Sequence, residues 1–505
     1  MRLRSVAAAT LLAAVTTTAS VAATPPASPA VNTWSTVGPA TPVGFLPGNV
    51  GVGIWNSKIG PDGRLYVYGS FVNAGGDETA DNLAVYDPAT QGWVGLGSNG
   101  AGNGALNGAV IDIAWIGSTL YAGGAFLNAA GNADADYLAA WNGSSWTARG
   151  SAPGVPALSN YVRSLDAQGG RLYVGGFFSN AGGVAEADRL AVYDGYDWSA
   201  LGNAGAGVGA LLSGVVYKVD ALPDGRVFAA GSFLNAGNTA AADSIAYWNG
   251  ATWNPVGDGV ATNEALGGTV VDFAISGATV YTVGAFSDAQ GNAAADGIAM
   301  WNGTTWTNLG SVAGDGVFAG ASEIDDVQLY GSNVIVSGVF TNAGGNANLD
   351  GVAVWNGTKW MPLGTPDPGM TGVTGYGFMV SGRTLYLSGN FASVGGVANT
   401  LCYGAFGLPA APSAPRSVTA ASGSKRVSLA WAAPTTANGA TLRDYVVQYR
   451  KLGSTTWKTF ADGVKTTRTA IVTGLTGGTT YQFRVLAKND WGTGSGSTII
   501  SKRAG

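Results

Sequence analysis

The sequence is 505 residues long and carries a formal net charge of −5, one cysteine and no histidine. Without histidine, the chain cannot build Ser-His-Asp or Cys-His nucleophile systems, or the usual zinc and copper sites. A single cysteine, Cys402, also excludes an intramolecular disulfide, so the stability of the fold has to come from its core. Function classes that depend on imidazole chemistry are therefore excluded.

The first 23 residues are typical of a signal peptide. Arg2 and Arg4 precede a short apolar run that ends in small residues at 21–23, which suits signal peptidase. The apolar run is too short for a membrane span. We therefore expect residues 1–23 to be removed and 24–31 to be a leader linker. The mature protein should be secreted, or held non-covalently at the cell surface, without membrane insertion.

Charge is distributed unevenly along the chain. Residues 409–505 hold 13 Lys and Arg against 3 Asp, a net charge of +10, whereas residues 24–408 hold 10 against 27, a net charge of −17. Between Arg226 and Lys359 there are eleven acidic residues and no basic one. An acidic region of this kind argues against a nucleic-acid partner.

One sequence pattern recurs seven times, as an apolar strand that ends in Gly-x-Phe and is followed by a turn of small residues. The intervals are 51 to 55 residues, with the phenylalanine at Phe71, Phe126, Phe178, Phe233, Phe286, Phe340 and Phe391. Each unit holds about four short strand patterns. A period near fifty with four strands per unit indicates a β-propeller, in which the units close a ring. The sequence therefore predicts an all-β fold with a seven-bladed β-propeller over residues 32–408.

The fourth strand of each unit predicts how the ring closes. Asn-Gly or Asp-Gly pairs predict a tight hairpin between the third and fourth strands. A tryptophan opens the fourth strand in only six units, at Trp93, Trp146, Trp198, Trp253, Trp306 and Trp360. The seventh unit lacks it, but residues 32–38 match 304–310 around Trp34. We therefore expect the N-terminal strand to complete the last blade.

A different pattern follows a Pro/Ala linker at 409–415. Residues 412–505 alternate apolar and polar positions around a tryptophan, Trp431, which is typical of a β-sandwich. The segment closely resembles a fibronectin type III domain, because Trp431 matches the core tryptophan and Leu475 with Tyr481 matches the leucine and the corner tyrosine. The resemblance implies a fibronectin type III β-sandwich after the repeats.

The repeats themselves carry a second resemblance. Their motif is Leu-Tyr-Val-Gly-Gly-x-Phe, followed by Leu-Ala-x-Trp/Tyr-Asn/Asp-Gly-x-x-Trp-x-x-Leu-Gly. It resembles the repeats of secreted and surface propellers related to the fungal cortical polarity marker and, more loosely, those of kelch and galactose-oxidase propellers. The resemblance implies a propeller in an extracellular setting and no catalytic residues. The copper chemistry of galactose oxidase does not carry over, because its ligands include histidine.

Binding residues are expected on the face where the long loops gather, because long loops on a rigid scaffold are where function concentrates. The Asn and Asp that recur in these loops are interpreted as turn-holding residues, with calcium ligation as the alternative. The recurring tryptophans are interpreted as packing residues, with sugar stacking as the alternative. Residues that depart from the repeat form our candidate ligand-binding face: Asp258, Glu264, Asp272, Asp315, Glu323, Asp325 and Asp326.

Acidic side chains that crowd together without basic partners raise one another's pKa or bind a cation. Asp272 and Asp326 are therefore candidate calcium ligands on innermost strands; otherwise no cofactor is expected. We assign no catalytic residue, although Glu264 and Glu323 are weak candidates because glycoside hydrolysis needs two carboxylates.

Three functions remain open from the sequence. The first is a monomeric, non-catalytic binding or adhesion protein that recognises an extracellular polysaccharide or a surface protein. The second is a polysaccharide-degrading hydrolase or its accessory module. The third is a structural component of a cell-surface assembly, with its basic module bound to an anionic wall polymer or to the acidic blades.

Overall fold

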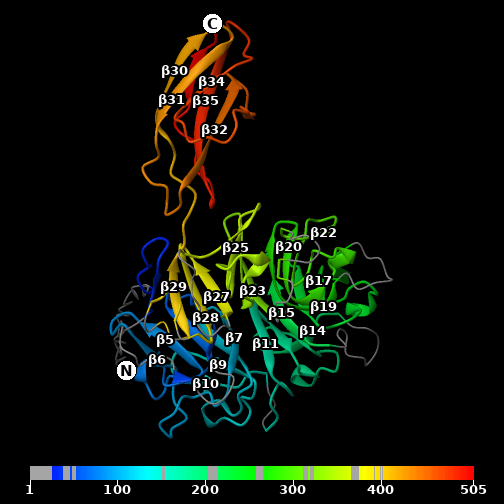
Figure 1. Ribbon diagram of the computed structural model, residues 1–505. Helices are drawn as coiled ribbons and strands as arrows, with labels where there is room; N and C mark the ends of the chain where they lie inside the picture. Colours follow the sequence, from blue (N-terminus) through cyan, green and yellow to red (C-terminus); the bar gives the residue numbers. More distant parts are fainter. Residues whose placement is uncertain are drawn as a thin grey trace, which may run out of the picture.

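The computed structural model describes residues 25–37, 46–47, 53–150, 154–202, 214–257, 266–310, 317–318, 323–364, 375–391, 393–397, 400 and 402–505. Over these residues the chain is all-β, and its helices are short 3₁₀ turns (Figure 1). None of these helices is long and apolar enough to cross a membrane.

The described residues before 408 form seven antiparallel sheets, named sheet 1 to sheet 7 in order of their first strands. The strands of sheets 1 to 4 are β3 (Gly53–Ile59), β4 (Leu65–Val72), β5 (Leu83–Asp87), β6 (Gly92–Gly95); β7 (Val110–Ile116), β8 (Thr119–Gly124), β9 (Leu138–Trp141), β10 (Trp146–Thr147); β11 (Val162–Gln168), β12 (Arg171–Gly176), β13 (Leu190–Tyr193), β14 (Trp198–Ala200); and β15 (Val216–Ala221), β16 (Val227–Gly231), β17 (Ile245–Trp248), β18 (Trp253–Pro255). A fifth strand, β2 (Leu46–Pro47), pairs with β4 in sheet 1.

The strands of sheets 5 to 7 are β19 (Gly267–Ser276), β20 (Thr279–Ser287), β21 (Ile298–Trp301), β22 (Trp306–Thr307); β23 (Glu323–Tyr330), β24 (Asn333–Val339), β25 (Val352–Trp355), β26 (Trp360–Met361); and β27 (Gly375–Ser381), β28 (Thr384–Gly389), β29 (Tyr403–Gly407), β1 (Trp34–Ser35). The N-terminal strand β1 pairs antiparallel with β29, as the sequence predicts, and places Trp34 opposite Phe406.

A β-bulge near the start of each first strand brings two backbones together. In sheet 4 the register shifts between Val216 and Lys218, opposite Gly231. A Cβ at Gly231 would collide with the carbonyl oxygen of Val215. The glycine two residues before the repeated phenylalanine therefore allows a close backbone approach in sheets 1 to 6.

The seven first strands contact one another in a closed circle, each touching the first strand of the next sheet and β27 touching β3. Outer strands are joined by tryptophans that reach the preceding sheet. Trp146 Nε1 donates to the Leu96 carbonyl over 2.6 Å, and Trp253 Nε1 donates to the Leu201 carbonyl over 2.9 Å. Both indoles are buried, so the predicted packing role of this series is confirmed for them.

Six of the seven turns after a second strand are held by an aspartate, as predicted. The turns contain η1 (Ala74–Gly76), η2 (Ala129–Gly131), η3 (Ala181–Gly183), η4 (Ala236–Asn238), η5 (Ala289–Gly291) and η6 (Ala343–Gly345). In the first of them Asn73 adopts a left-handed conformation (φ 54°), and its backbone N–H donates to Asp81 Oδ1 over 2.9 Å. The same bond recurs at Asp136, Asp188, Asp243, Asp296 and Asp350.

The C-terminal sandwich packs two sheets around Trp431. Its strands are β30 (Arg416–Gly423), β31 (Arg426–Ala432), β32 (Leu442–Lys451), β33 (Lys458–Thr459), β34 (Thr469–Val472), β35 (Thr480–Asn489), β36 (Gly492–Thr493) and β37 (Ile500–Arg503). The Tyr481 hydroxyl accepts a hydrogen bond from the backbone N–H of Thr476 over 3.1 Å, which is the corner contact expected from the sequence.

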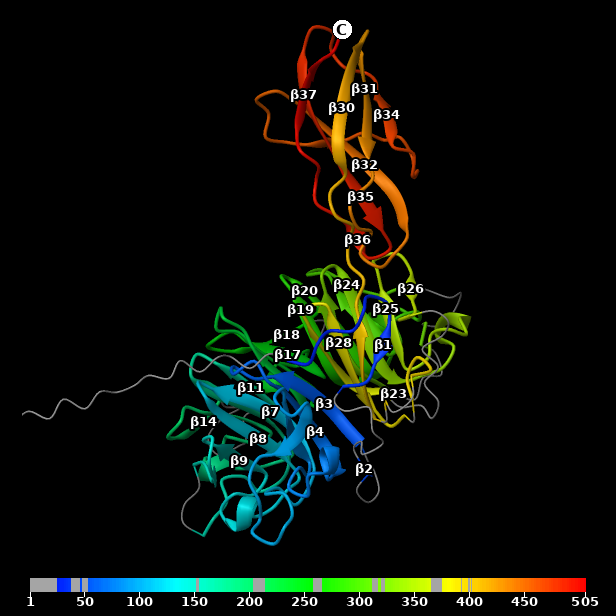
Figure 2. The same cartoon turned by 90° about the vertical axis from the view of Figure 1, so that its left-hand side faces the viewer.

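Short turns join the first strand to the second in each sheet and the third strand to the fourth in sheets 1 to 6, and we call the end that carries them the short-turn end. The sandwich projects away from the seven sheets and meets them at the short-turn ends of sheets 6 and 7 (Figures 1 and 2). Trp491 anchors the junction: it is buried against the sheet 7 core, with its ring 6.0 Å from Tyr330. Asp490 Oδ2 forms ion pairs with Lys359 Nζ across the junction (3.3 Å) and with Arg443 Nη2 within the sandwich (2.9 Å).

Trp34→Ala should destabilise the fold by about 3–5 kcal/mol, because it removes a buried indole from the strand that completes sheet 7. Urea unfolding followed by circular dichroism measures the loss. The control is Tyr196→Ala, which removes a side chain from a residue that is 86% exposed. Equal stability of the two variants would contradict a sealing role for Trp34.

Trp491→Ala should loosen the sandwich from the sheets without unfolding either, because the indole is the main apolar contact between them. We expect faster proteolysis in the linker at 409–415 and a broader distance distribution in small-angle X-ray scattering. An unchanged cleavage rate would mean that the polar contacts of Asp490 are sufficient to hold the junction.

Candidate functional site

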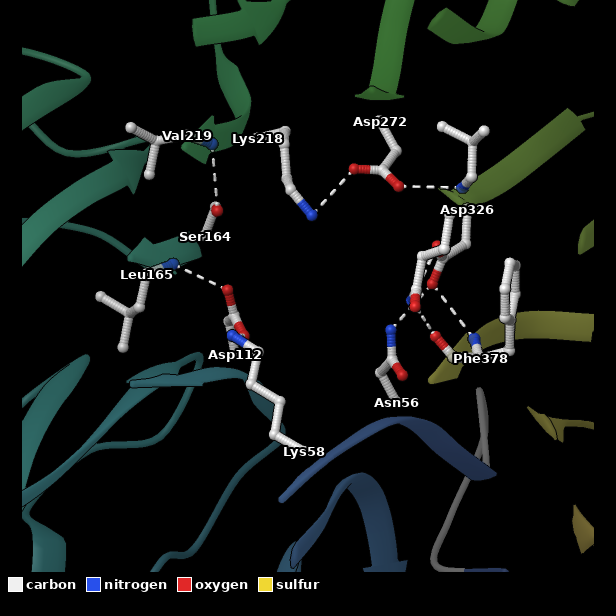
Figure 3. Close-up of polar contacts among 12 residues, drawn as sticks. Asn56, Lys58, Asp112, Ser164, Leu165, Lys218, Val219, Asp272, Asp326 and Phe378 are labelled. Atoms are coloured by element: carbon white, nitrogen blue, oxygen red, sulfur yellow. Dashed lines mark hydrogen bonds and ion pairs between the residues drawn. The ribbon is translucent and has the colours of Figure 1, made fainter. Parts of the chain in front are cut away.

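A ring of polar side chains lies where the seven first strands meet. The ring position follows the bulge in every first strand and is occupied by Asn56, Asp112, Ser164, Lys218, Asp272, Asp326 and Gly377. Figure 3 shows the side chains of the labelled members pointing toward a common space. We call this set the polar ring.

Members of the polar ring bind the backbone of the next sheet. In each case a side-chain oxygen accepts the N–H that follows the ring position of the neighbouring strand. The pairs are Asp112 Oδ2 with Leu165 (2.8 Å), Ser164 Oγ with Val219 (3.1 Å), Asp272 Oδ2 with Val327 (2.9 Å) and Asp326 Oδ2 with Phe378 (3.1 Å). These bonds satisfy buried backbone donors and fix neighbouring sheets relative to one another.

Two lysines neutralise two of these aspartates. Lys58 Nζ lies 2.6 Å from Asp112 Oδ1, and Lys218 Nζ lies 2.9 Å from Asp272 Oδ1. Burial opposes the charge of Lys218, but the carboxylates of Asp272 and Asp326 outweigh it, and the pKa of the lysine is raised. Our expectation that no basic residue neutralises the acidic cluster is therefore wrong for Asp272. The expectation failed because Lys218 belongs to the neighbouring sheet 4 and lies before Arg226 in the sequence, outside the stretch that lacks basic residues.

Two acidic groups on β23, Asp325 and Asp326, have raised pKa values. Burial, with Asp272 nearby, raises the pKa of Asp326 to about 7 even though Lys218 and the Phe378 N–H act in the opposite direction. Burial also raises the pKa of Asp325 to about 8, assisted by the charges of Glu323 and Asp326. Asp325 Oδ2 is buried and has no hydrogen-bond partner among the described residues. Its environment therefore favours the neutral acid at pH 7.

Two hollow spaces lie along the central axis near the polar ring, and Lys58 and Met379 line both of them. A cavity of about 560 Å³ lies toward the start of the first strands and receives residues from all seven of them. A second cavity, of about 450 Å³, is lined by residues further along the same strands, such as Ile113, Asp166 and Val380. We call the larger space the central cavity, and the polar ring forms its floor.

Aromatic and charged groups line the central cavity above the ring. Trp55 and Tyr217 occupy bulge positions, and the guanidinium carbon of Arg163 lies 4.9 Å from the Tyr217 ring centroid. Phe177 supports Tyr217 through an edge contact with a centroid distance of 6.3 Å. Glu323 and Asp325 lie in the same wall. The central cavity therefore combines apolar rings with both signs of charge, as small-ligand sites do.

The sequence-derived candidates are only partly brought together. Asp272, Glu323, Asp325 and Asp326 line the central cavity. Asp258, Glu264 and Asp315 lie outside the described residues. Glu323 is the first residue of β23, where its backbone pairs with Val339, and so does not belong to a long loop.

Calcium is not supported by the geometry of the described residues. Asp272 is occupied by Lys218 and the Val327 N–H, and Asp326 Oδ2 accepts hydrogen bonds from Phe378 and from Asn56 Nδ2 (2.9 Å). Within the described ranges there is no group of three or more His, Cys, Asp or Glu that could hold a metal ion. Both aspartates instead serve the contacts between sheets.

Sequence reasoning missed the cavity residues Trp55, Arg163, Tyr217 and Lys218. A signal for them was present, because every ring position lies 14 or 15 residues before the repeated phenylalanine, and every bulge residue lies one residue earlier. A comparison of these two neighbouring positions across the seven repeats would have brought these residues together.

Comparison with known proteins identifies the C-terminal region. Residues 413–503 match the family described as fibronectin type III domain. This part of the chain is a fibronectin type III domain. Domains of this type are typical of extracellular proteins.

Solved structures show the same partial likeness. The chain is similar to the titin kinase with its flanking domains (27% identity, 19% of this chain and 17% of that one, TM-score 0.18). It is also similar to the twitchin kinase region from C. elegans (21% identity, 19% and 17%, TM-score 0.18) and to the FN1-FN3 domains of chicken CNTN1 (26% identity, 19% and 32%, TM-score 0.17). The chain thus covers less than a fifth of the first two structures, and these likenesses say nothing about the seven sheets.

The raised pKa of Asp325 predicts a pH-dependent stability. The neutral acid is the form that the fold favours, so the contribution of Asp325 to stability should be fully present below its ordinary pKa of 3.8 and be lost as pH rises through about 8. Asp325→Asn cannot ionise and should show a shallower decline in melting temperature between pH 4 and 9. The exposed Asp197→Asn controls for the loss of one charge. Parallel curves for wild type and Asp325→Asn would contradict the assignment.

Proposed function

We propose that the chain is a secreted, seven-bladed β-propeller joined to a fibronectin type III domain, and that it binds an extracellular carbohydrate or protein without catalysis. The closed circle of first strands and the pairing of β1 with β29 support the propeller. The apolar leader at residues 1–23 supports secretion. Ligand enters the central cavity from the side of the long loops.

One observation carries the binding role: the central cavity of about 560 Å³ receives side chains from all seven first strands. Its volume falls in the range of small-molecule sites, and its floor is fixed by hydrogen bonds between neighbouring sheets. Trp55 and Tyr217 offer flat apolar faces, while Arg163 and Asp325 offer a donor and an acceptor. A preformed site of this composition binds a ligand with little reordering of the protein.

Binding should be tested with the mature chain, residues 24–505, incubated with insoluble cellulose, chitin, starch and peptidoglycan. Bound protein and released reducing sugar are assayed in the same tubes. We expect binding without sugar release, and a loss of about tenfold or more in affinity for Tyr217→Ala because a cavity wall is removed. Binding that survives in Tyr217→Ala would place the site elsewhere on the molecule.

A hydrolase is the second candidate, and the pKa of Asp325 favours it. A carboxyl held neutral at pH 7 is suited to act as a general acid, and Glu323 lies in the same wall as a second carboxylate. Sugar release that disappears in both Asp325→Asn and Glu323→Gln would establish this reaction. Glu264→Gln tests the carboxylate that lies outside the described residues.

A cell-surface role is supported by the charge of the fibronectin domain. Its three aspartates are all engaged, at Asp444, Asp462 and Asp490. Arg450 and Arg484 each lie 4.4 Å from the Trp457 ring centroid, and glutamines hold their Nε atoms. The cationic surface would bind an anionic wall polymer, and its retention on walls should then fall with salt and in Arg450→Gln/Arg484→Gln.

A further inference from the structure

A pocket outside the central axis is lined by two tryptophans and an ion pair. It lies between sheets 1 and 2, at the turns that follow β3, β7 and β9, and has a volume of about 470 Å³. Trp115 and Trp141 line it together with the turn residues Asp62 and Arg64. None of these residues lines the central cavity, but Trp115 also lines the second axial cavity of about 450 Å³.

Trp115 departs from the repeat at a position that is otherwise aliphatic. It pairs with Leu120 at the end of the first hairpin of sheet 2. The matching positions of the other six first strands hold Ile59, Ala167, Ala221, Ile275, Leu329 and Val380. The fold therefore does not require an aromatic side chain here. Trp115 is also only partly buried, so part of its indole faces the pocket.

The polar wall of the pocket is held in place by its own hydrogen bonds. Arg64 Nε donates to Asp62 Oδ2 over 2.6 Å, and the Tyr66 hydroxyl donates to the same oxygen over 2.8 Å. Arg64 Nη2 donates to the Tyr66 hydroxyl over 3.3 Å. Tyr66 also packs edge-on against Trp115, with ring centroids 5.2 Å apart. One connected network therefore fixes both the guanidinium and the indole.

The charges of this pocket cancel, and this favours an uncharged ligand. Its carboxylate and its guanidinium are already paired, so neither an anion nor a cation finds an uncompensated partner. The guanidinium has five N–H donors and uses only part of them in this network, and the carboxylate accepts on both oxygens. Flat indoles beside neutral, fixed hydrogen-bonding groups match a ligand with apolar C–H faces and many hydroxyls.

We propose that this pocket binds the rings of a neutral polysaccharide, with Trp115 as the stacking surface and Asp62 and Arg64 as the hydroxyl partners. The proposal goes beyond the central cavity and does not depend on it. The carbohydrate would bind at the short-turn ends of sheets 1 and 2. The fibronectin domain contacts the same ends of sheets 6 and 7.

The test is calorimetric titration of residues 24–505 with cellohexaose, chitohexaose, maltohexaose and xylohexaose. We expect at least one to bind, and Trp115→Ile to lower the affinity by about tenfold or more. Isoleucine occupies the same position in sheets 1 and 5, so this variant should fold, and its melting temperature checks that it does. Trp115→Phe keeps a ring and should retain part of the affinity.

A matched control exists in sheet 4. Its turn repeats the ion pair, with Arg226 Nε donating to Asp224 Oδ2 over 2.9 Å, but Phe228 and Ile275 replace the tyrosine and the tryptophan. Arg64→Ala should weaken binding, whereas Arg226→Ala should not. Absence of binding by all four sugars, wild-type affinity in Trp115→Ile, or an equal loss in Arg226→Ala would each overturn the proposal. Loss of binding in Tyr217→Ala alone would point to the central cavity instead.

Discussion

Capture of a backbone N–H by a side chain of the preceding sheet is the interaction on which the arrangement of the seven sheets depends. In four of the seven first strands, the N–H that follows the ring position donates to a side chain of the preceding sheet. Asp112, Ser164, Asp272 and Asp326 accept such donors from the next strand. Because a buried, unpaired N–H is costly, each sheet stabilises the position of its neighbour.

This constraint explains why the centre of the molecule is polar although the spaces between sheets are apolar. Aspartates are needed as acceptors, and their burial has to be compensated, which Lys58 and Lys218 do for two of them. Sheet 6 is different, because Asp325 adds a second carboxyl beside Asp326 without a lysine of its own. Asp325 and Asp326, whose pKa values are both raised, therefore lie next to each other in the wall of the central cavity.

The repeat made much of this fold predictable from sequence. A recurring Gly-x-Phe, the Asn-Gly hairpins and the missing seventh tryptophan predict the strands, the turns and the completion of the last sheet by the N-terminal strand. Trp431 and Tyr481 likewise predicted the fibronectin type III sandwich after the repeats. Repetition makes such positions visible because the same physical need returns in every unit.

The sites were harder to predict, because function lies in the departures from the repeat. Lys218 and Asp272 are 54 residues apart in sequence but form an ion pair, so a count of charges along the chain misjudged the acidic cluster. Trp115 and Arg64 likewise meet only because neighbouring sheets pack side by side. Contacts between sheets depend on where each strand begins relative to its bulge, which hydrophobic patterns do not specify.

The shared last sheet has a consequence for the order of folding. Trp34 donates to the carbonyl of Leu363, a contact that spans 329 residues. During synthesis β1 emerges first, yet it has no partner until β29 follows at the far end of the repeats. Closing so long a loop is slow, and until then β1 and the β29 edge of sheet 7 are open to pairing with other chains. Because the fibronectin domain follows β29 directly, its own folding can begin only when the partner of β1 has already been made.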